Sequence, residues 1–272
     1  TFLIVPFLLW SVITLLFKAI FGEVYSPLEY LQIIFTGRAA ETFYFIPLLV
    51  QLYLLSPIIT RMAKKSPWLL LSIGLIILLI IRGEQYFLLL NVRFPGQEII
   101  RAISPSWLFF WGGFWYSLGV VAGFHLNSIK EKLTKFRWFF LVFAIVLIPV
   151  GMWEWEYLLT QSGRGWFPPR ETIIYGLYAF MALGAFLGFS LKKISKIRWL
   201  NQLGSKSYGI YLTHTLALTI VAKIIYTFAP FILGQQWLFQ PMLIFSGLFF
   251  PLILMEIVQR TPLKRWYVYL FG

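Results

Sequence analysis

Long apolar runs alternate with short basic or aromatic segments along the whole chain. A helix of roughly 20 apolar residues crosses the bilayer core of about 30 Å. Lipid offers the backbone no hydrogen-bond partners, so such runs favour helices. The pattern predicts an all-α, polytopic membrane helix bundle with about eight transmembrane helices, of which the third is short enough to be tilted or re-entrant. The predicted spans lie near residues 2–21, 42–60, 67–82, 106–125, 138–158, 172–191, 208–229 and 238–258.

Composition agrees with a membrane protein and excludes several other classes. The chain is 60% hydrophobic and 12% charged, and its mean hydropathy of +0.80 lies outside the range of soluble domains. The net charge of +13 is spread over short loops, so no nucleic-acid partner is expected. Cysteine is absent and histidine occurs twice. Thiol chemistry is therefore excluded, and we expect neither a metal site nor a bound cofactor.

Basic residues gather in every second segment between the apolar runs. Segments 61–66, 127–137, 192–206 and 260–272 carry 15 lysines and arginines against one glutamate. The alternate segments carry six arginines against eight glutamates. Lysine and arginine accumulate in cytoplasmic loops. The asymmetry predicts a multi-pass protein of the cell membrane with both ends of this chain in the cytoplasm.

The longer outer loops are rich in aromatic residues. Segments 83–105 and 153–171 contain tryptophan, tyrosine, proline and arginine, as in WEWEYLLTQSGRGWFPPRE. One interpretation is interfacial anchoring. The other is a lid or binding surface for a polar, sugar-like acceptor that stacks on the rings. Trp107, Trp111 and Trp115 recur at helical spacing, which is typical of packing or lipid contact.

Two groups of polar residues lie within the apolar runs. Gln51, near the middle of LLVQLYLLSP, needs a partner inside the bundle because an amide in hydrocarbon is costly. Tyr44, seven residues earlier, is expected on the same helical face. Arg82 and Glu84, in LLIIRGEQY, are expected to form a charged pair at an outer helix end. That pair is either solvated or lines the mouth of a pocket.

The stretch SYGIYLTHTLAL, residues 207–218, places a polar wedge at the start of the seventh run. The stretch follows the most basic segment, so it enters from the cytoplasm, and His214 lies about 10 Å in from Ser207. The wedge is either a hydrogen-bonded contact between helices or a functional site. We expect it to face the bundle interior, with Ile210 and Ala217 on the opposite face. Its members are Ser207, Tyr208, Tyr211, His214 and Thr215.

Three segments resemble the integral-membrane acyltransferase 3 family. LGSKSYGIYLTHTLAL resembles its penultimate-helix signature S-Y-G-I-Y-L-x-H, and FYFIPLLVQLYLLSPII and WYSLGVVAG resemble two further helices in the same order. The resemblance runs through essentially the whole chain. It implies about ten helices in the full protein and transfer of acetyl- or succinyl-like groups from acyl-CoA to a hydroxyl of an extracytoplasmic glycan or lipid-linked sugar. Some relatives are described instead as polysaccharide export permeases or flippases, which is the alternative.

The resemblance also bears on the catalytic residue. The family's proposed catalytic histidine lies in an R/K-x10-H pattern on the first helix, and an R-x-x-R motif follows the second. Neither pattern occurs here, and Thr1–Phe17 resembles the next helix. The chain is thus expected to be one acyltransferase-like domain, 1–272, without its first two helices and inactive alone. The expected site residues are His214 as an auxiliary group and, for substrate binding, Ser207, Tyr208, Tyr211, Gln51, Tyr44, Arg82 and Glu84.

Overall fold

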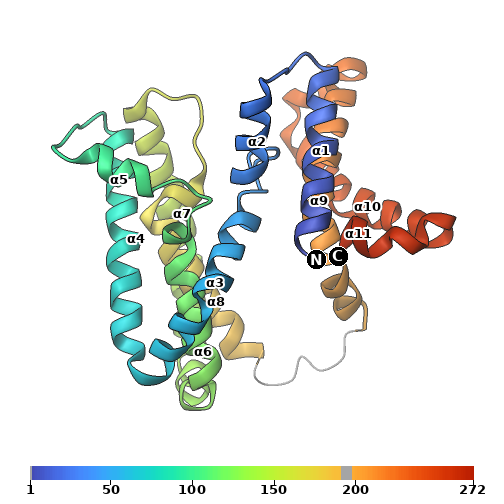
Figure 1. Cartoon of the computed structure of the whole chain (residues 1–272). Coiled ribbons are helices and arrows are strands. Elements are labelled where there is room, and N and C mark those ends of the chain that lie inside the picture. The colour runs from blue at the N-terminus through green and yellow to red at the C-terminus, as the bar shows by residue number, and fades with distance from the viewer. Residues whose placement is uncertain (1, 191–197) are drawn as a thin grey trace. The chain divides into compact units, whose positions relative to one another are not determined.

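A computed structural model describes residues 2–190 and 198–272, which form helices and no strands. The all-α prediction is confirmed. The chain divides into two compact units, which we call unit 1 (Thr1–Val50 with Lys196–Gly272) and unit 2 (Gln51–Ser195). Figure 1 shows the helices of both units. Residues 192–197 of the predicted cytoplasmic segment 192–206 lie outside the described residues.

Each predicted run corresponds to a helix, and short helices fill several connections. The eight long helices are α1 (Ile4–Ile20), α3 (Phe45–Lys65), α4 (Pro67–Leu89), α6 (Phe109–Lys135), α7 (Arg137–Ser162), α8 (Ile173–Ser190), α9 (Arg198–Phe228) and α10 (Gln236–Arg260). The short helices are α2 (Pro27–Thr36), α5 (Gln97–Ile103) and α11 (Tyr267–Phe271), with 3-10 turns at Pro169–Glu171, Pro230–Gly234 and Pro262–Trp266.

Five helices in the described part of the chain are long and apolar enough to cross a membrane. They are α3, α4, α7, α10 and the Asn201–Phe228 part of α9, whereas α1 and α8 are shorter apolar helices. Helix α6 is rich in glycine and aromatic residues rather than aliphatic ones. It also has a non-helical residue, His125, whose Nε2 lies 3.2 Å from the Ala63 carbonyl oxygen. Several membrane-spanning helices are therefore present, and the prediction of eight is not confirmed.

Three boundaries differ from the predicted spans because helix formation does not stop where the apolar run stops. Helix α4 is not short: it continues past Arg82 to Leu89, since the charged groups near its end contact protein atoms. Helix α7 continues to Ser162, so the first half of the predicted loop 153–171 is helical. Helix α9 begins at Arg198, ten residues before the predicted start.

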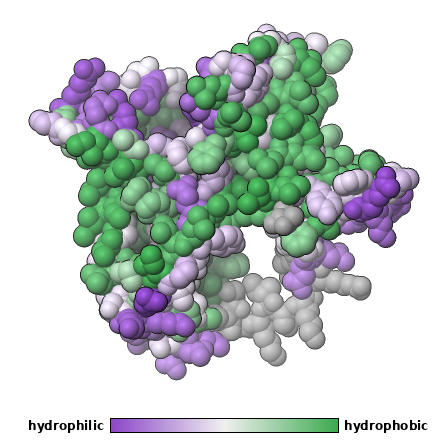
Figure 2. All heavy atoms as spheres, viewed as in Figure 1, coloured by the Kyte–Doolittle hydropathy of each residue, from purple (hydrophilic) through white to green (hydrophobic). Residues whose placement is uncertain are grey.

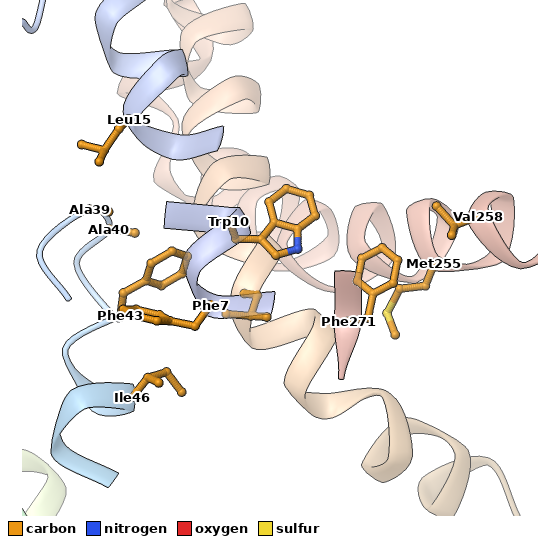
Figure 3. Close-up of a cluster of buried hydrophobic side chains, with 11 residues drawn as sticks. Phe7, Trp10, Leu15, Ala39, Ala40, Phe43, Ile46, Met255, Val258 and Phe271 are labelled. Carbon is orange, nitrogen blue, oxygen red and sulfur yellow. The ribbon is translucent and has the colours of Figure 1, made fainter. Parts of the chain in front are cut away.

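Unit 1 has an aromatic core in which α9 approaches α10 and α11 very closely. Figure 3 shows Phe7 and Phe43 of this core side by side, with ring centroids 5.9 Å apart. A Cβ built at Gly209 would lie 2.7 Å from Met255 Cε and 3.0 Å from Phe271 Cβ. The glycine of the SYGIYLTH stretch is therefore required by packing. The core consists of Phe7, Trp10, Leu15, Ala39, Ala40, Phe43, Ile46, Leu212, Met255, Val258 and Phe271.

Unit 2 contains α4, α6, α7 and α8 packed against one another. The missing side chain of Gly184 lets α8 lie close to α7. A Cβ built at this position would lie only 2.7 Å from Phe140 Cδ1. Figure 2 shows hydrophobic residues along the middle of this unit and hydrophilic ones gathered at its ends. Large apolar side chains such as Leu69, Ile76 and Ile80 are exposed on α4. An apolar surface of this extent is suited to contact with lipid.

Candidate functional site

Both tyrosines of the polar wedge in unit 1 hydrogen-bond to backbone far away in the sequence. The Tyr208 hydroxyl donates to the Leu3 carbonyl at 2.5 Å, and the Tyr211 hydroxyl donates to the Thr42 carbonyl. The two rings stack with centroids 6.2 Å apart. These contacts fasten α9 to the beginning of α1 and to the segment between α2 and α3. Both tyrosine hydroxyls therefore have hydrogen-bond partners within the protein, as a packing contact requires.

His214 lies on one wall of a pocket between α9 and α10. Its Nδ1 is 2.8 Å from the Tyr211 carbonyl oxygen and 3.2 Å from that of Ile210. Carbonyl oxygens only accept, so Nδ1 carries the proton in the neutral ring and Nε2 is the acceptor. The pocket has a volume of about 540 Å³, and its polar lining comes from Ser207, Tyr211, His214 and Gln240.

One expectation for the wedge is wrong. Ile210 lines the same pocket as His214 rather than the opposite face. The reason is helical geometry, since residues four apart lie one above the other. Ala217 is completely buried and so packs against protein. The polar residues of the wedge therefore differ in their surroundings: the Tyr208 hydroxyl bonds to backbone, Ser207 and His214 line a pocket, and Tyr211 does both.

Gln51 holds the beginning of α6 in unit 2. Its Nε2 donates to the Trp107 carbonyl at 2.7 Å, and its Oε1 accepts from the Phe109 N–H at 3.2 Å. Phe109 is the first residue of α6, where backbone N–H groups have no partner within the helix. The expected partner inside the bundle is confirmed. Tyr44 was expected to share a helical face with Gln51. It lies just before α3, which begins at Phe45, and is therefore not part of that helix.

Arg82 and Glu84 do not pair with each other, contrary to the prediction. The Arg82 guanidinium lies 4.4 Å from the Trp111 ring centroid and donates to Gln85 Oε1 at 3.0 Å. Glu84 is 2% exposed, and its Oε1 lies 3.7 Å from Arg101 Nε. Residues two apart point to different sides of a helix. Each of the two therefore lines a separate pocket, of about 330 Å³ for Arg82 and 420 Å³ for Glu84.

A hydrogen-bonded cluster at the start of α8 was not predicted. The Tyr86 hydroxyl donates to Glu154 and accepts from the Ile173 N–H at 2.9 Å. Glu154 Oε2 accepts from the Ile174 N–H at 3.2 Å. A carboxylate is favourable there because the N-terminus of a helix is positive. Two glutamates at the end of an apolar run, in WEWEY, indicate that a buried carboxylate could lie there. The sequence did not indicate which of the two turns inward.

The aromatic loop after α7 forms a concave surface. A pocket of about 510 Å³ is lined by Trp155, Trp166, Tyr175, Tyr178 and Thr172, together with apolar residues of α7. The Trp155 Nε1–H donates to the Phe167 carbonyl at 2.9 Å, which holds the loop against α7. Concave aromatic surfaces with a few polar groups are typical of small-molecule sites. We call this the aromatic pocket.

Glu171, beside the aromatic pocket, should make stability depend on pH. Burial raises the pKa of its carboxyl group above the ordinary 4.5, although Arg170, Arg82 and Arg164 oppose the shift. Because the folded state binds the Glu171 proton more tightly than the unfolded state does, the protonated carboxyl group stabilises the fold. This stabilisation is complete below pH 4.5 and is lost as pH rises through the pKa of the folded state. The Glu171→Gln variant should therefore gain stability relative to the original chain as pH rises above 4.5.

Thermal unfolding in detergent over a pH series measures this difference. Glu156 is exposed two turns from the loop, so Glu156→Gln is the matched control and should leave the pH dependence unchanged. Parallel stability curves for Glu171→Gln and the original chain would contradict the prediction.

The described residues offer binding groups: an imidazole in unit 1, and aromatic rings and a buried guanidinium in unit 2. Within residues 2–190 and 198–272, no group of three or more histidine or acidic residues is placed to hold a metal ion. The sequence model of a family described as an acyltransferase domain matches residues 1–256. Comparisons with curated proteins and with solved structures found no match.

Proposed function

The chain belongs to the acyltransferase 3 family, and on that premise we propose that it is a membrane O-acyltransferase. Its proposed donor is a cytoplasmic acyl-CoA carrying an acetyl- or succinyl-like group. Its proposed acceptor is a hydroxyl of an extracytoplasmic glycan or lipid-linked sugar. The observation that carries this proposal is the family match over residues 1–256, with membrane-spanning helices in support.

The proposed chemistry moves the acyl group from the thioester of the donor to the acceptor hydroxyl, which becomes an oxygen ester. A general base takes the proton of the acceptor hydroxyl, the oxygen attacks the thioester carbonyl, and the coenzyme A thiolate leaves and is protonated. His214 would assist by accepting a hydrogen bond from the donor at Nε2. We place the base itself upstream of Thr1, because neither R/K-x10-H nor R-x-x-R occurs in residues 1–272. Residues 1–272 alone should then be inactive.

We further propose eight membrane crossings with both ends of this chain in the cytoplasm, made by α1, α3, α4 and α6–α10. The alternation of basic segments supports this arrangement. It would place the Ser207 end of the His214 pocket near the cytoplasm, where the donor is. It would place the aromatic pocket at the outer end of unit 2, where a glycan is.

Single cysteines test the orientation directly because the chain has none of its own. Ser128, in the basic end of α6, and Gln161, at the end of α7, are both exposed. In intact cells, Gln161→Cys should react with an impermeant maleimide and Ser128→Cys should react only after the membrane is opened. The reverse pattern would overturn the proposed orientation.

The decisive experiment measures acyl transfer. Membranes containing the chain together with the proposed upstream helices are incubated with labelled acetyl-CoA and an acceptor glycan, and base-labile label on the glycan is counted. Transfer above that of membranes without the protein is the expected result. Movement of unmodified glycan across the membrane, without label, would refute the proposal and favour the permease alternative.

A further inference from the structure

The His214 pocket of unit 1 changes from polar to aliphatic along its length. On α9 the lining runs from Ser207 through Ile210 and Tyr211 to His214, and the next lining residue is Leu218. The wall that α10 contributes consists of Gln240, Leu243, Ile244, Gly247 and Leu248. Hydrogen-bonding groups therefore lie between the Ser207 end and the imidazole, whereas the lining beyond the imidazole is mostly aliphatic.

Two close approaches show how α9 and α10 are aligned. A Cβ built at Gly209 would lie 2.7 Å from Met255 Cε, and one built at Gly247 would lie 3.3 Å from Leu218 Cδ2. Later positions on α9 thus face earlier positions on α10, so the two helices are antiparallel. Leu218 lies opposite Gly247 and one turn beyond His214, which is about 6 Å of helix. The lining residues that precede Gly247 on α10 lie farther still from the imidazole.

Beyond His214 the pocket offers no positive charge to an anionic group. Among the residues that the structure describes, no lysine or arginine lines it. Lys206, which directly precedes the first lining residue, lies 3.9 Å from Glu256 Oε2. Gln240 is the polar residue at the far end, about 10 Å along α10 from Gly247. A carboxylate placed between them would lose its hydration without gaining a partner.

The acyl group of a donor suits this part of the pocket. If the donor enters at the Ser207 end with its thioester at His214, its acyl chain continues toward Leu218. A four-carbon acyl chain is about as long as the distance from His214 to Leu218. We propose, resting on the proposed function, that the pocket beyond His214 holds the acyl group, that it accepts only an uncharged chain, and that Leu218 sets the length of that chain.

Direct binding measures this preference without catalysis. The chain together with the proposed upstream helices is purified in a neutral detergent and titrated with CoA, acetyl-CoA, butyryl-CoA and succinyl-CoA. Each methylene added between acetyl and butyryl should tighten binding about three- to fourfold. Succinyl-CoA has a carboxylate where butyryl-CoA has a methyl group, so it should bind roughly tenfold or more weakly. Equal affinity for all four compounds, or binding of none, would overturn the proposal.

Two substitutions change the pocket at the level of Leu218 in opposite directions. The original protein should bind hexanoyl-CoA no more tightly than butyryl-CoA, whereas Leu218→Ala should bind it roughly tenfold more tightly because two further methylenes are buried. Gly247→Ala adds a methyl group to the opposite wall, so it should weaken butyryl-CoA more than acetyl-CoA. The matched controls Leu31→Ala and Gly119→Ala, at exposed positions, should leave the chain-length preference unchanged.

The chain-length preference is a readout that loss of packing alone does not move. An unchanged preference in both variants, at normal unfolding temperatures, would show that Leu218 does not set the length. Gly247→Ala adds only one methyl group, so it decides the question by itself if Leu218→Ala does not fold.

Acyl transfer then separates the acyl pocket from the enzyme assignment. The kcat/KM values for transfer to a glycan should follow the order of binding. Binding in the expected order without any transfer would refute the enzyme assignment and leave the acyl pocket intact. Transfer of succinyl groups as fast as butyryl groups would refute the acyl pocket and leave the enzyme assignment intact.

Discussion

Replacing Glu154 with leucine should lower the free energy of unfolding by about 1–3 kcal/mol. The carboxylate accepts hydrogen bonds from the Tyr86 hydroxyl and the Ile174 N–H. Leucine fills similar space but leaves the hydroxyl and the first N–H groups of α8 without this acceptor. Unpaired polar groups are costly where the surroundings are apolar. Reversible unfolding in detergent, followed by circular dichroism, measures the change.

Glu156 supplies the matched control, since it lies in the same helix two residues away and is exposed. Glu156→Leu should change stability by less than about 0.5 kcal/mol. Tyr86→Phe removes the same hydrogen bond from the other side, so the double variant should cost less than the sum of the two single variants. Equal effects at the two glutamates, or strict additivity with Tyr86→Phe, would show that the cluster does not stabilise α8.

In a form of the protein that transfers acyl groups, His214→Ala should weaken use of the acyl-CoA donor roughly three- to thirtyfold, mainly through a higher KM. The Nδ1–H of the ring already donates to the carbonyl oxygens one turn earlier. Only Nε2 remains for a ligand in the pocket. Loss of one hydrogen bond to the donor weakens binding without removing the base, which we place upstream of Thr1.

The His214→Asn variant distinguishes a ligand contact from a structural one. Asparagine can donate where Nδ1 does but does not extend to the position of Nε2. If Nε2 contacts the donor, asparagine should be as impaired as alanine. Recovery of activity by asparagine would mean that the ring only packs. Complete loss of transfer with normal expression and donor binding would place the catalytic base at His214 itself.

The amino-acid sequence alone determined the features that depend on short stretches of chain. Apolar runs predicted helices at the correct places because a backbone in lipid must bond within its own segment. A lone amide in such a run predicted that Gln51 would find a partner, although not that the partner would be the beginning of α6. The family followed from local motifs such as SYGIYLTH, whose glycine is explained by the close approach of Met255.

The tertiary structure decided which polar groups meet. Glu154 and Glu156 have the same local sequence environment, and only the packing of α7 on α8 turns the first inward to Tyr86. The partner of Glu84 is Arg101, in a separate short helix, rather than its neighbour Arg82. The pockets likewise combine side chains from helices distant in sequence. Such contacts depend on how helices pack, because the energy of a buried charge is set by groups far along the chain.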